Sequence, residues 1–120
     1  MSYKGGYSAE FGIIDNFDAQ KDYSASYEPE KYHCVAICEY ALNDWWDSLS
    51  EMKTYFNSFS RPEKNLARCG VTLIPPDSLE LLIAVIDGNT KEEFRSDGLE
   101  IIDILKKAKS ENKFVIHYGV

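Results

Sequence analysis

The sequence predicts a single α+β domain, residues 1–120, in which three helices pack on a sheet of about four strands. The chain has the usual length of one domain, and its hydrophobic content of 44% is enough for one core. Short apolar runs that are typical of strands alternate with longer segments that have helical spacing and capping residues. The predicted order of the elements is β-β-α-β-α-α-β.

Four short segments are predicted to be strands, because they are rich in aromatic and β-branched residues and too short for stable helices. They cover residues 7–14, 32–38, 67–74 and 113–120. In the last segment Phe114, Ile116 and Tyr118 share one face, as the alternation of side chains along a strand requires. If 32–38 and 67–74 share a sheet, the helix between them forms a right-handed parallel crossover.

The first helix is predicted over residues 40–56, where apolar residues recur at alternating spacings of three and four. This stripe, which we expect to pack against the sheet, consists of Leu42, Trp45, Leu49, Met52, Phe56 and Phe59. On a helical wheel Trp46 and Tyr55 lie about 90° from the centre of the stripe, on opposite sides. We therefore predict that Trp45 is a core residue and that Trp46 lies at the margin of the core.

Two more helices are predicted over residues 75–88 and 90–112, because each segment begins with a capping box and then shows helical spacing. The boxes are formed by Asp77 with Glu80 and by Thr90 with Glu93. Gly98 lies inside the second segment, where glycine costs about 1 kcal/mol relative to alanine. We expect Gly98 to kink or divide that helix.

Residues 15–31 are predicted to form a long surface loop, because the segment is polar, rich in Asp, Ser and Tyr, and contains Pro29. It is longer than most connections between elements. Loops of this length are typically functional, mobile, or held in place by their own side chains. Phe17, Tyr23 and Tyr27 are the residues that we expect to pin the loop to the body of the domain.

The charge distribution argues against nucleic acid as a ligand. The formal net charge is −7, and the one dense basic group, Lys106, Lys107 and Lys109, lies near a predicted helix end, where cations complement the helix dipole. Binding to nucleic acid needs clustered basic side chains that neutralise several phosphates. An acidic surface fits a basic protein partner, although solubility alone also accounts for it.

No segment of the sequence predicts a membrane span or export. The longest apolar runs fall far short of the roughly 20 residues that cross a bilayer. Residues 1–6 lack the apolar core and the cleavage site of a signal peptide, so we expect a cytoplasmic location. In that compartment Cys34, Cys38 and Cys69 are expected to be reduced and to act as small core residues.

Aromatic residues are the strongest candidates for a binding surface. The chain contains eight tyrosines and two tryptophans, and both types are common at protein interfaces. At the flank of its helix, Trp46 either covers the seam with a neighbouring element or anchors a partner. The predicted partner-binding residues are Trp46, Tyr55, Tyr40, Tyr23 and Tyr27.

The alternative is a small-molecule pocket beside the loop at 15–31, with Asp15, Asp18, His33 and His117 as its candidate residues. The two aspartates lack the ligand spacing of an EF-hand, so no metal site is predicted. A strand histidine is also commonly satisfied by a backbone carbonyl group. The sequence contains no phosphate-binding loop, dinucleotide fingerprint or nucleophile elbow, so no cofactor is predicted and a binding protein is favoured over an enzyme.

Several short motifs carry a resemblance to a known group of proteins. They are GIIDNFD, YEPEKYHC, MKTYF, GVTLIPPDSL and the terminal FVIHYGV. Over residues 12–120 the chain resembles a family of small, acidic, uncharacterised bacterial proteins, chiefly from Gram-positive species. Some proteins of this kind are similar to immunity proteins, which neutralise a toxin made beside them by binding it. The resemblance implies no particular binding residue.

Three functional hypotheses follow. The leading one is a cytoplasmic protein-binding module, of the immunity type, that pairs an acidic and aromatic surface with a basic toxin domain. The alternative is a small enzyme or ligand-binding protein with a pocket beside the loop at 15–31. The third is a homodimer joined through a sheet edge or through the flank that carries Trp46.

Overall fold

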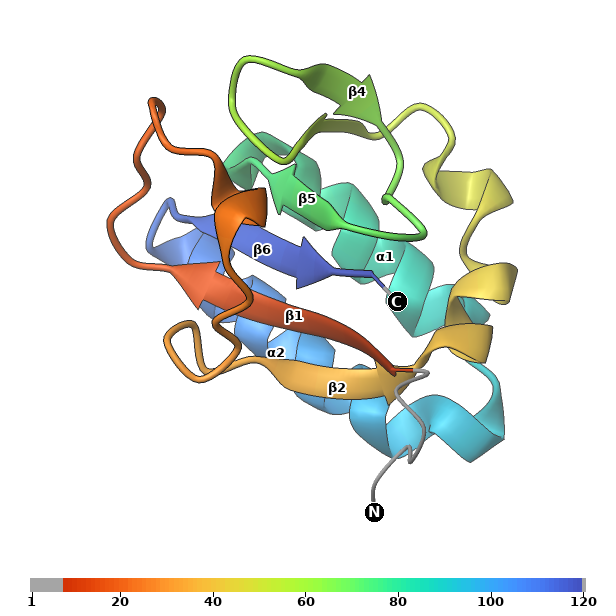
Figure 1. Ribbon diagram of the computed structural model, residues 1–120. Coiled ribbons are helices and arrows are strands. Elements are labelled where there is room, and N and C mark those ends of the chain that lie inside the picture. Colours follow the sequence, from red (N-terminus) through yellow and green to blue (C-terminus); the bar gives the residue numbers. More distant parts are fainter. Residues whose placement is uncertain (1–7, 120) are drawn as a thin grey trace.

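The computed structural model describes residues 8–119 and shows an α+β fold built on one six-stranded sheet (Figure 1). Every strand pairing in this part of the chain is antiparallel, and the strand order is β2-β1-β6-β5-β3-β4. The strands are β1 (Ser8–Ile14), β2 (Val35–Cys38), β3 (Lys53–Phe56), β4 (Pro62–Lys64), β5 (Val71–Ile74) and β6 (Phe114–Tyr118). The predicted α+β class is confirmed, whereas the expectation of about four strands is wrong because β3 and β4 were not predicted.

Helices cover one face of the sheet, and the loop at 15–31 crosses the other (Figure 1). The main helices are α1 (Leu79–Asn89) and α2 (Arg95–Ser110), and each follows a short 3₁₀ helix, η4 (Pro76–Ser78) or η5 (Glu92–Phe94). Gly98 does not divide α2. It is buried where the two helices meet, and a Cβ atom at this position would lie 3.2 Å from Cγ2 of Thr90. None of the helices described is long and apolar enough to cross a bilayer.

The predicted helix over residues 40–56 is wrong. Two 3₁₀ helices, η2 (Glu39–Asp44) and η3 (Asp47–Leu49), occupy its first part, and its last residues form β3. Two 3₁₀ helices followed by a strand can place apolar side chains toward the core at the same sequence spacing as one α-helix. The spacing alone therefore does not distinguish the two structures. Lys53 is exposed and Thr54 is buried, which is the alternation of a strand. Phe59, predicted to be part of the buried stripe, is 38% exposed.

The predicted parallel crossover is also wrong. Between β2 and β5 lie β1 and β6, and successive antiparallel pairings leave β2 and β5 running in opposite directions. The strand at the end of the chain, β6, is inserted between β1 and β5. Such pairings between distant segments leave no local signal in the sequence.

The sheet buries side chains on both of its faces. On the helix side the largest cluster includes Phe11, Trp45, Leu49, Leu82 and Leu105. On the loop side a second cluster consists of Ile14, Tyr23, Tyr32, Val71, Leu73, Ile116 and Tyr118. In β6, Ile116 and Tyr118 belong to the loop-side cluster and Phe114 packs against it, so the predicted sharing of one face by these three residues is confirmed.

The loop at 15–31 is held against the sheet by its own aromatic residues. Tyr23, in the 3₁₀ helix η1 (Tyr23–Ala25), is 3% exposed, and its ring stacks on Phe17 with the centroids 5.7 Å apart. Phe17 in turn stacks on Phe114 at 3.7 Å. Tyr27 contacts the ring of Tyr118 at 4.8 Å although it is 63% exposed. These contacts confirm the predicted role of Phe17, Tyr23 and Tyr27 in pinning the loop.

Gly12 in β1 allows the end of this loop to approach the sheet closely. A Cβ atom at Gly12 would lie 2.6 Å from the carbonyl oxygen of Tyr32 and 2.7 Å from Sγ of Cys34. We therefore expect Gly12→Ala to lower the free energy of unfolding by about 2 kcal/mol or more, because backbone atoms must move to relieve the overlap. Denaturant unfolding measures this change.

Gly88 in α1 provides the matched control. Beyond its chain neighbours and the backbone of its own helix, no atom lies within 4 Å of the position that its Cβ atom would take, and its backbone is helical. Gly88→Ala is expected to leave the stability unchanged or to raise it by up to about 1 kcal/mol, because alanine is the better helix former. If Gly12→Ala and Gly88→Ala lowered the free energy of unfolding by the same amount, the close approach at Gly12 would be contradicted.

Candidate functional site

The two adjacent tryptophans point to different environments. Trp45 is fully buried, its ring lies 6.3 Å from that of Phe11, and its indole N–H donates a hydrogen bond of 3.1 Å to Oγ1 of Thr90. Trp46 is only partly buried and packs against the edge of the same core cluster. The predicted placement of one tryptophan in the core and the other at its margin is thus confirmed, although the segment is not an α-helix.

The exposed side of Trp46 is in contact with a cation of the same chain. The guanidinium carbon of Arg68 lies 4.4 Å from the centroid of the indole. Arg68 also donates a hydrogen bond of 2.6 Å to Oδ1 of Asn43, and its Nη1 lies 3.8 Å from a carboxylate oxygen of Glu39. A guanidinium over an indole face is a favourable cation–π arrangement. Arg68 is far from Trp46 in the sequence, and no pattern in the sequence predicted this contact.

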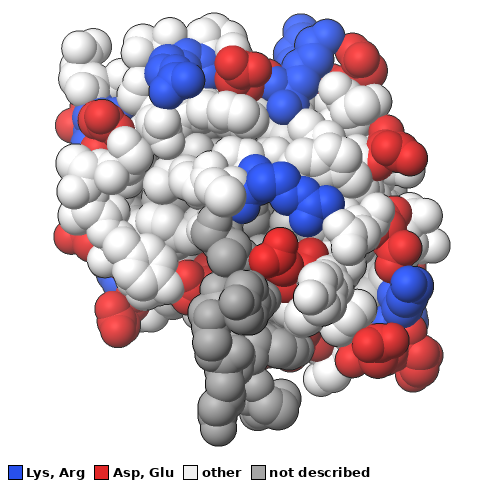
Figure 2. Space-filling view, turned by 45° about the vertical axis from the view of Figure 1, so that its right-hand side comes forward, with Lys and Arg blue, Asp and Glu red and all other residues white. Residues whose placement is uncertain are grey.

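The segment that carries Trp46 is acidic. Residues 39–51 contain four carboxylates and no lysine or arginine. Figure 2 shows Asp and Glu side chains along the right-hand side of one face of the molecule, with Lys and Arg side chains among them and at its centre. Tyr40 in the same segment is 67% exposed. We call this region the Trp46 surface, and its residues are Glu39, Tyr40, Asn43, Trp46, Asp47 and Arg68.

Tyr55 does not belong to the Trp46 surface. It lies on β3 and contacts Phe59 at 4.5 Å, in an aromatic group on the loop side that also contains Phe17 and Phe114. Among the residues described, no ring contact joins Trp46 to a tyrosine. We expected Trp46 to form an exposed patch with Tyr55, Tyr40 or loop tyrosines. Tyr55 is ruled out because it lies on a strand and not on the predicted helix, whereas Tyr40 is exposed on the same segment as Trp46.

The two loop tyrosines also differ in their availability to a partner. Tyr23 is buried, and its hydroxyl accepts a hydrogen bond of 2.9 Å from the backbone N–H of Asp18. Tyr27 is exposed and its hydroxyl donates to the carboxylate of Glu10. Desolvation, together with this hydrogen bond to Glu10, raises the pKa of Tyr27. Of the five predicted partner-binding residues, only Tyr40 and Trp46 lie on the Trp46 surface.

Two of the predicted pocket residues line one cavity. Asp15 and Asp18 border a cavity of about 400 Å³ under the loop, together with Lys21 and Lys31. His33 borders an adjoining cavity of about 290 Å³, which also contacts Asp15. The hydrogen bond and the charge of Lys113 lower the pKa of Asp15, so this carboxylate is ionised at neutral pH. A general acid requires the opposite shift.

His117 is not a pocket residue. It is fully buried, with Nδ1 3.2 Å from the carbonyl oxygen of Glu10 and Nε2 3.3 Å from that of Ala67. Its ring packs against that of Phe11 in the core on the helix side, with the centroids 4.6 Å apart and the ring planes tilted by 30°. Burial lowers the pKa of His117 to about 4. The ring is therefore neutral at physiological pH and out of reach of a ligand.

The three cysteines are free thiols that differ in burial. Burial raises the pKa of the Cys34 thiol to about 12, so its thiolate is scarce at neutral pH. All three cysteines are free, but Cys69 is exposed, so its predicted place in the core is wrong. Within residues 8–119, no group of three or more His, Cys, Asp or Glu side chains is arranged to hold a metal ion.

Comparison with known proteins gives no family for this chain. No protein-family model matches the sequence, and no curated protein or solved structure matches it significantly.

Proposed function

We propose that this protein is a binding module that recognises a basic protein partner through the Trp46 surface. The observation that carries the proposal is the combination, on residues 39–51, of an exposed tyrosine and a partly buried indole with four carboxylates. Arg68 adds one cation to this surface. The resemblance to immunity-type proteins favours a basic toxin domain as the partner. Binding, and not catalysis, is the activity that this surface supports.

Trp46 is suited to anchor a partner because its position is fixed before binding. One side of the residue packs on the core beside buried Trp45, and its carbonyl oxygen accepts a hydrogen bond of 3.1 Å from Nδ2 of Asn65. A rigid aromatic side chain loses little conformational entropy on binding. Arg68 already lies over the indole face, so a partner either contacts the remaining exposed part of the ring or displaces Arg68 from it.

The carboxylates of this segment are expected to act mainly on the rate of association. Glu39, Asp44 and Glu51 each have a cation of the same chain within 4.0 Å, so they are partly neutralised in the free protein. Asp47 is exposed and adds to the negative potential. Opposite charges steer encounter, and salt screens this effect. Association should therefore slow as the salt concentration rises.

The proposal is tested with the purified products of the genes adjacent to the gene for this chain. Each is titrated at low salt by biolayer interferometry, and a specific complex with a basic product is expected. Trp46→Ala should then weaken binding by at least about thirtyfold, because a central aromatic anchor contributes roughly 2 kcal/mol or more.

Tyr27→Ala is the matched control, since it removes an exposed tyrosine on the loop side of the sheet. This variant should bind the partner as the unchanged protein does. The proposal fails if no adjacent product forms a complex at low salt, or if Trp46→Ala and Tyr27→Ala have the same affinity for the partner that is found.

A further inference from the structure

The two edges of the sheet differ in how they are protected against pairing with a further strand. One edge is β4 (Pro62–Lys64), which consists of a proline, an acid and a base. Proline and charged side chains are the residues by which natural proteins keep an exposed edge from pairing. The other edge is β2 (Val35–Cys38), which contains neither a proline nor a charged residue. The unguarded edge of the described sheet is therefore β2.

The direction of the backbone groups on β2 follows from the pairing of β1. The N–H of Ile13 donates a hydrogen bond of 3.2 Å to the carbonyl oxygen of Tyr32, so the odd-numbered residues of β1 direct their backbone groups toward β2. Phe11 lies opposite Val35 in the register. Val35 and Ile37 therefore bond to β1, whereas the N–H and C=O groups of Ala36 point away from the sheet. Within residues 8–119 no other segment bonds to these groups of Ala36.

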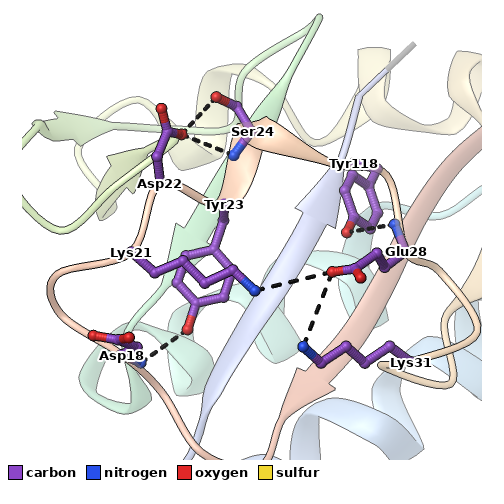
Figure 3. Close-up of polar contacts among 8 residues, drawn as sticks. All are labelled: Asp18, Lys21, Asp22, Tyr23, Ser24, Glu28, Lys31 and Tyr118. Carbon is purple, nitrogen blue, oxygen red and sulfur yellow. Dashed lines mark hydrogen bonds and ion pairs between the residues drawn. The ribbon is translucent and has the colours of Figure 1, made fainter.

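The face of the sheet under the loop at 15–31 is closed by the chain itself. Lys21 and Lys31 both approach the carboxylate of Glu28, with their Nζ atoms 3.9 Å and 4.0 Å from its Oε1 (Figure 3). The backbone N–H of Glu28 donates a hydrogen bond of 3.2 Å to the hydroxyl of Tyr118 on β6. These contacts hold the loop over β6. A further strand thus finds free backbone groups at the edge of the sheet and not on this face.

The side chains around Ala36 match those of a second copy of the same strand. Residues 34–38 read Cys-Val-Ala-Ile-Cys, with a β-branched residue on each side of the alanine and a cysteine at each end. An antiparallel pair with Ala36 on the twofold axis places Val35 opposite Ile37 of the second copy, and Cys34 opposite its Cys38. A twofold interface must be complementary to itself. This strand meets that requirement at every position.

The paired side chains would also continue the two apolar clusters of the single chain. Val35 packs against the helix-side cluster to which Ile37 belongs, so these two residues meet on the helix side of the joined sheets. Cys34 packs against the loop-side cluster. Val35, Ala36 and Cys38 are only partly buried in the single chain. Pairing therefore removes further apolar surface from water.

We propose that the protein forms a twofold homodimer in which the two β2 strands pair antiparallel and join the two six-stranded sheets into one. The Trp46 surface begins at Glu39, directly after the last residue of β2. Antiparallel strands have these ends on opposite sides of the axis, so the dimer carries two separate Trp46 surfaces. The dimer goes beyond the proposed binding of a basic partner and does not depend on it.

Sedimentation equilibrium of the whole protein, from about 5 µM to about 500 µM, tests the dimer. Because the paired strands are short, we expect a Kd of about 100 µM or tighter but not a permanent complex. Each copy has a formal net charge of −7, so raising the salt concentration should leave the dimer intact or strengthen it. A monomer mass at the highest concentration, or dissociation of the dimer by salt, would overturn the proposal.

A proline at each edge locates the interface. Ala36→Pro removes the N–H group at the axis but no bond to β1, and should raise the Kd of the dimer at least about tenfold. Lys64→Pro is the matched control on β4. The N–H of Asn65 donates to the carbonyl oxygen of Met52 on the β3 side, so that of Lys64 points outward. Lys64→Pro should dimerise as the unchanged protein does, and equal dimerisation of the two variants would exclude β2 as the interface.

Ala36→Lys provides a second variant that keeps the backbone N–H. In the single chain the new cation lies opposite Glu10, which accommodates its charge, whereas at the axis it faces the same cation of the second copy. This variant should also raise the Kd at least about tenfold. If circular dichroism shows that Ala36→Pro is unfolded, an unchanged Kd for Ala36→Lys overturns the proposal. Trp46→Ala should dimerise normally, so failure of the dimer and failure of partner binding are distinguished.

Discussion

Trp45→Ala should lower the free energy of unfolding by about 3–5 kcal/mol, the range observed when a large buried aromatic residue is truncated. The indole is fully buried, contacts Phe11, and is tied to Thr90 by its N–H group. Its loss leaves a cavity between the 3₁₀ segment and α1, and leaves Oγ1 of Thr90 without this donor. Urea unfolding followed by circular dichroism measures the change.

The neighbouring residue supplies the comparison for this prediction. Trp46→Ala removes a side chain of the same size that is only partly buried, so we expect a loss of about 1 kcal/mol. The two substituted residues are adjacent in the sequence, but the side chain removed at position 45 is fully buried and the one removed at position 46 is only partly buried. Similar losses, or a larger loss for Trp46→Ala, would show that the two indoles are not placed as described.

The second large effect is a loss of stability in mild acid. Burial lowers the pKa of His117 to about 4 in the folded chain, whereas an exposed histidine has a pKa of about 6.5. The unfolded chain therefore binds this proton more readily, and the stabilising contribution is complete above pH of about 6.5 and is lost as the pH falls toward 4. The gap between the two values corresponds to about 3 kcal/mol.

The hydrogen bonds of His117 explain why this loss has a limit. A neutral imidazole has one N–H group, so it donates to only one of the two carbonyl oxygens, those of Glu10 and Ala67, that face its nitrogens. Protonation supplies the second donor, which offsets part of the cost of a buried charge. Burial remains the larger effect and sets the direction of the shift.

Urea unfolding at pH 7 and at pH 4 tests this prediction, with His117→Gln as the variant that cannot take up the proton. The unchanged protein should lose about 3 kcal/mol more than the variant between these two values. Three carboxylates also have lowered pKa values in the folded chain, namely Asp15, Asp22 and Glu51. Their contributions to stability are lost at a more acidic pH than that of His117. Equal losses in protein and variant would exclude His117 as the cause.

The sequence predicted those elements whose signals are local. The strands β1, β2, β5 and β6 have apolar or β-branched runs. The helices α1 and α2 lie in the predicted segments but begin four and five residues later than predicted, and neither of the predicted capping residues is their N-cap. It also predicted which side of the 39–49 segment is buried, because that depends only on the directions of neighbouring side chains. Trp45 and Trp46 lie between η2 and η3, and both have α-helical φ and ψ, so their side chains point apart as they do in an α-helix.

The parts that could not be predicted depend on contacts between distant segments. In β4 all three residues are exposed and one is Pro62, so neither alternation nor β propensity marks it as a strand. The antiparallel order follows from the insertion of β6 between β1 and β5. At the candidate site, the contact between Arg68 and Trp46 arises only in the folded chain.

The central claim is that the 39–49 segment keeps one indole in the core and offers the next one to a partner. Acrylamide quenching of tryptophan fluorescence in the variants Trp45→Phe and Trp46→Phe tests it most directly, because each variant retains one reporter. The indole of Trp46 should be quenched at least about threefold more efficiently than that of Trp45, since a collisional quencher needs access to the ring. Equal shielding of both, or easier quenching of Trp45, would contradict the claim.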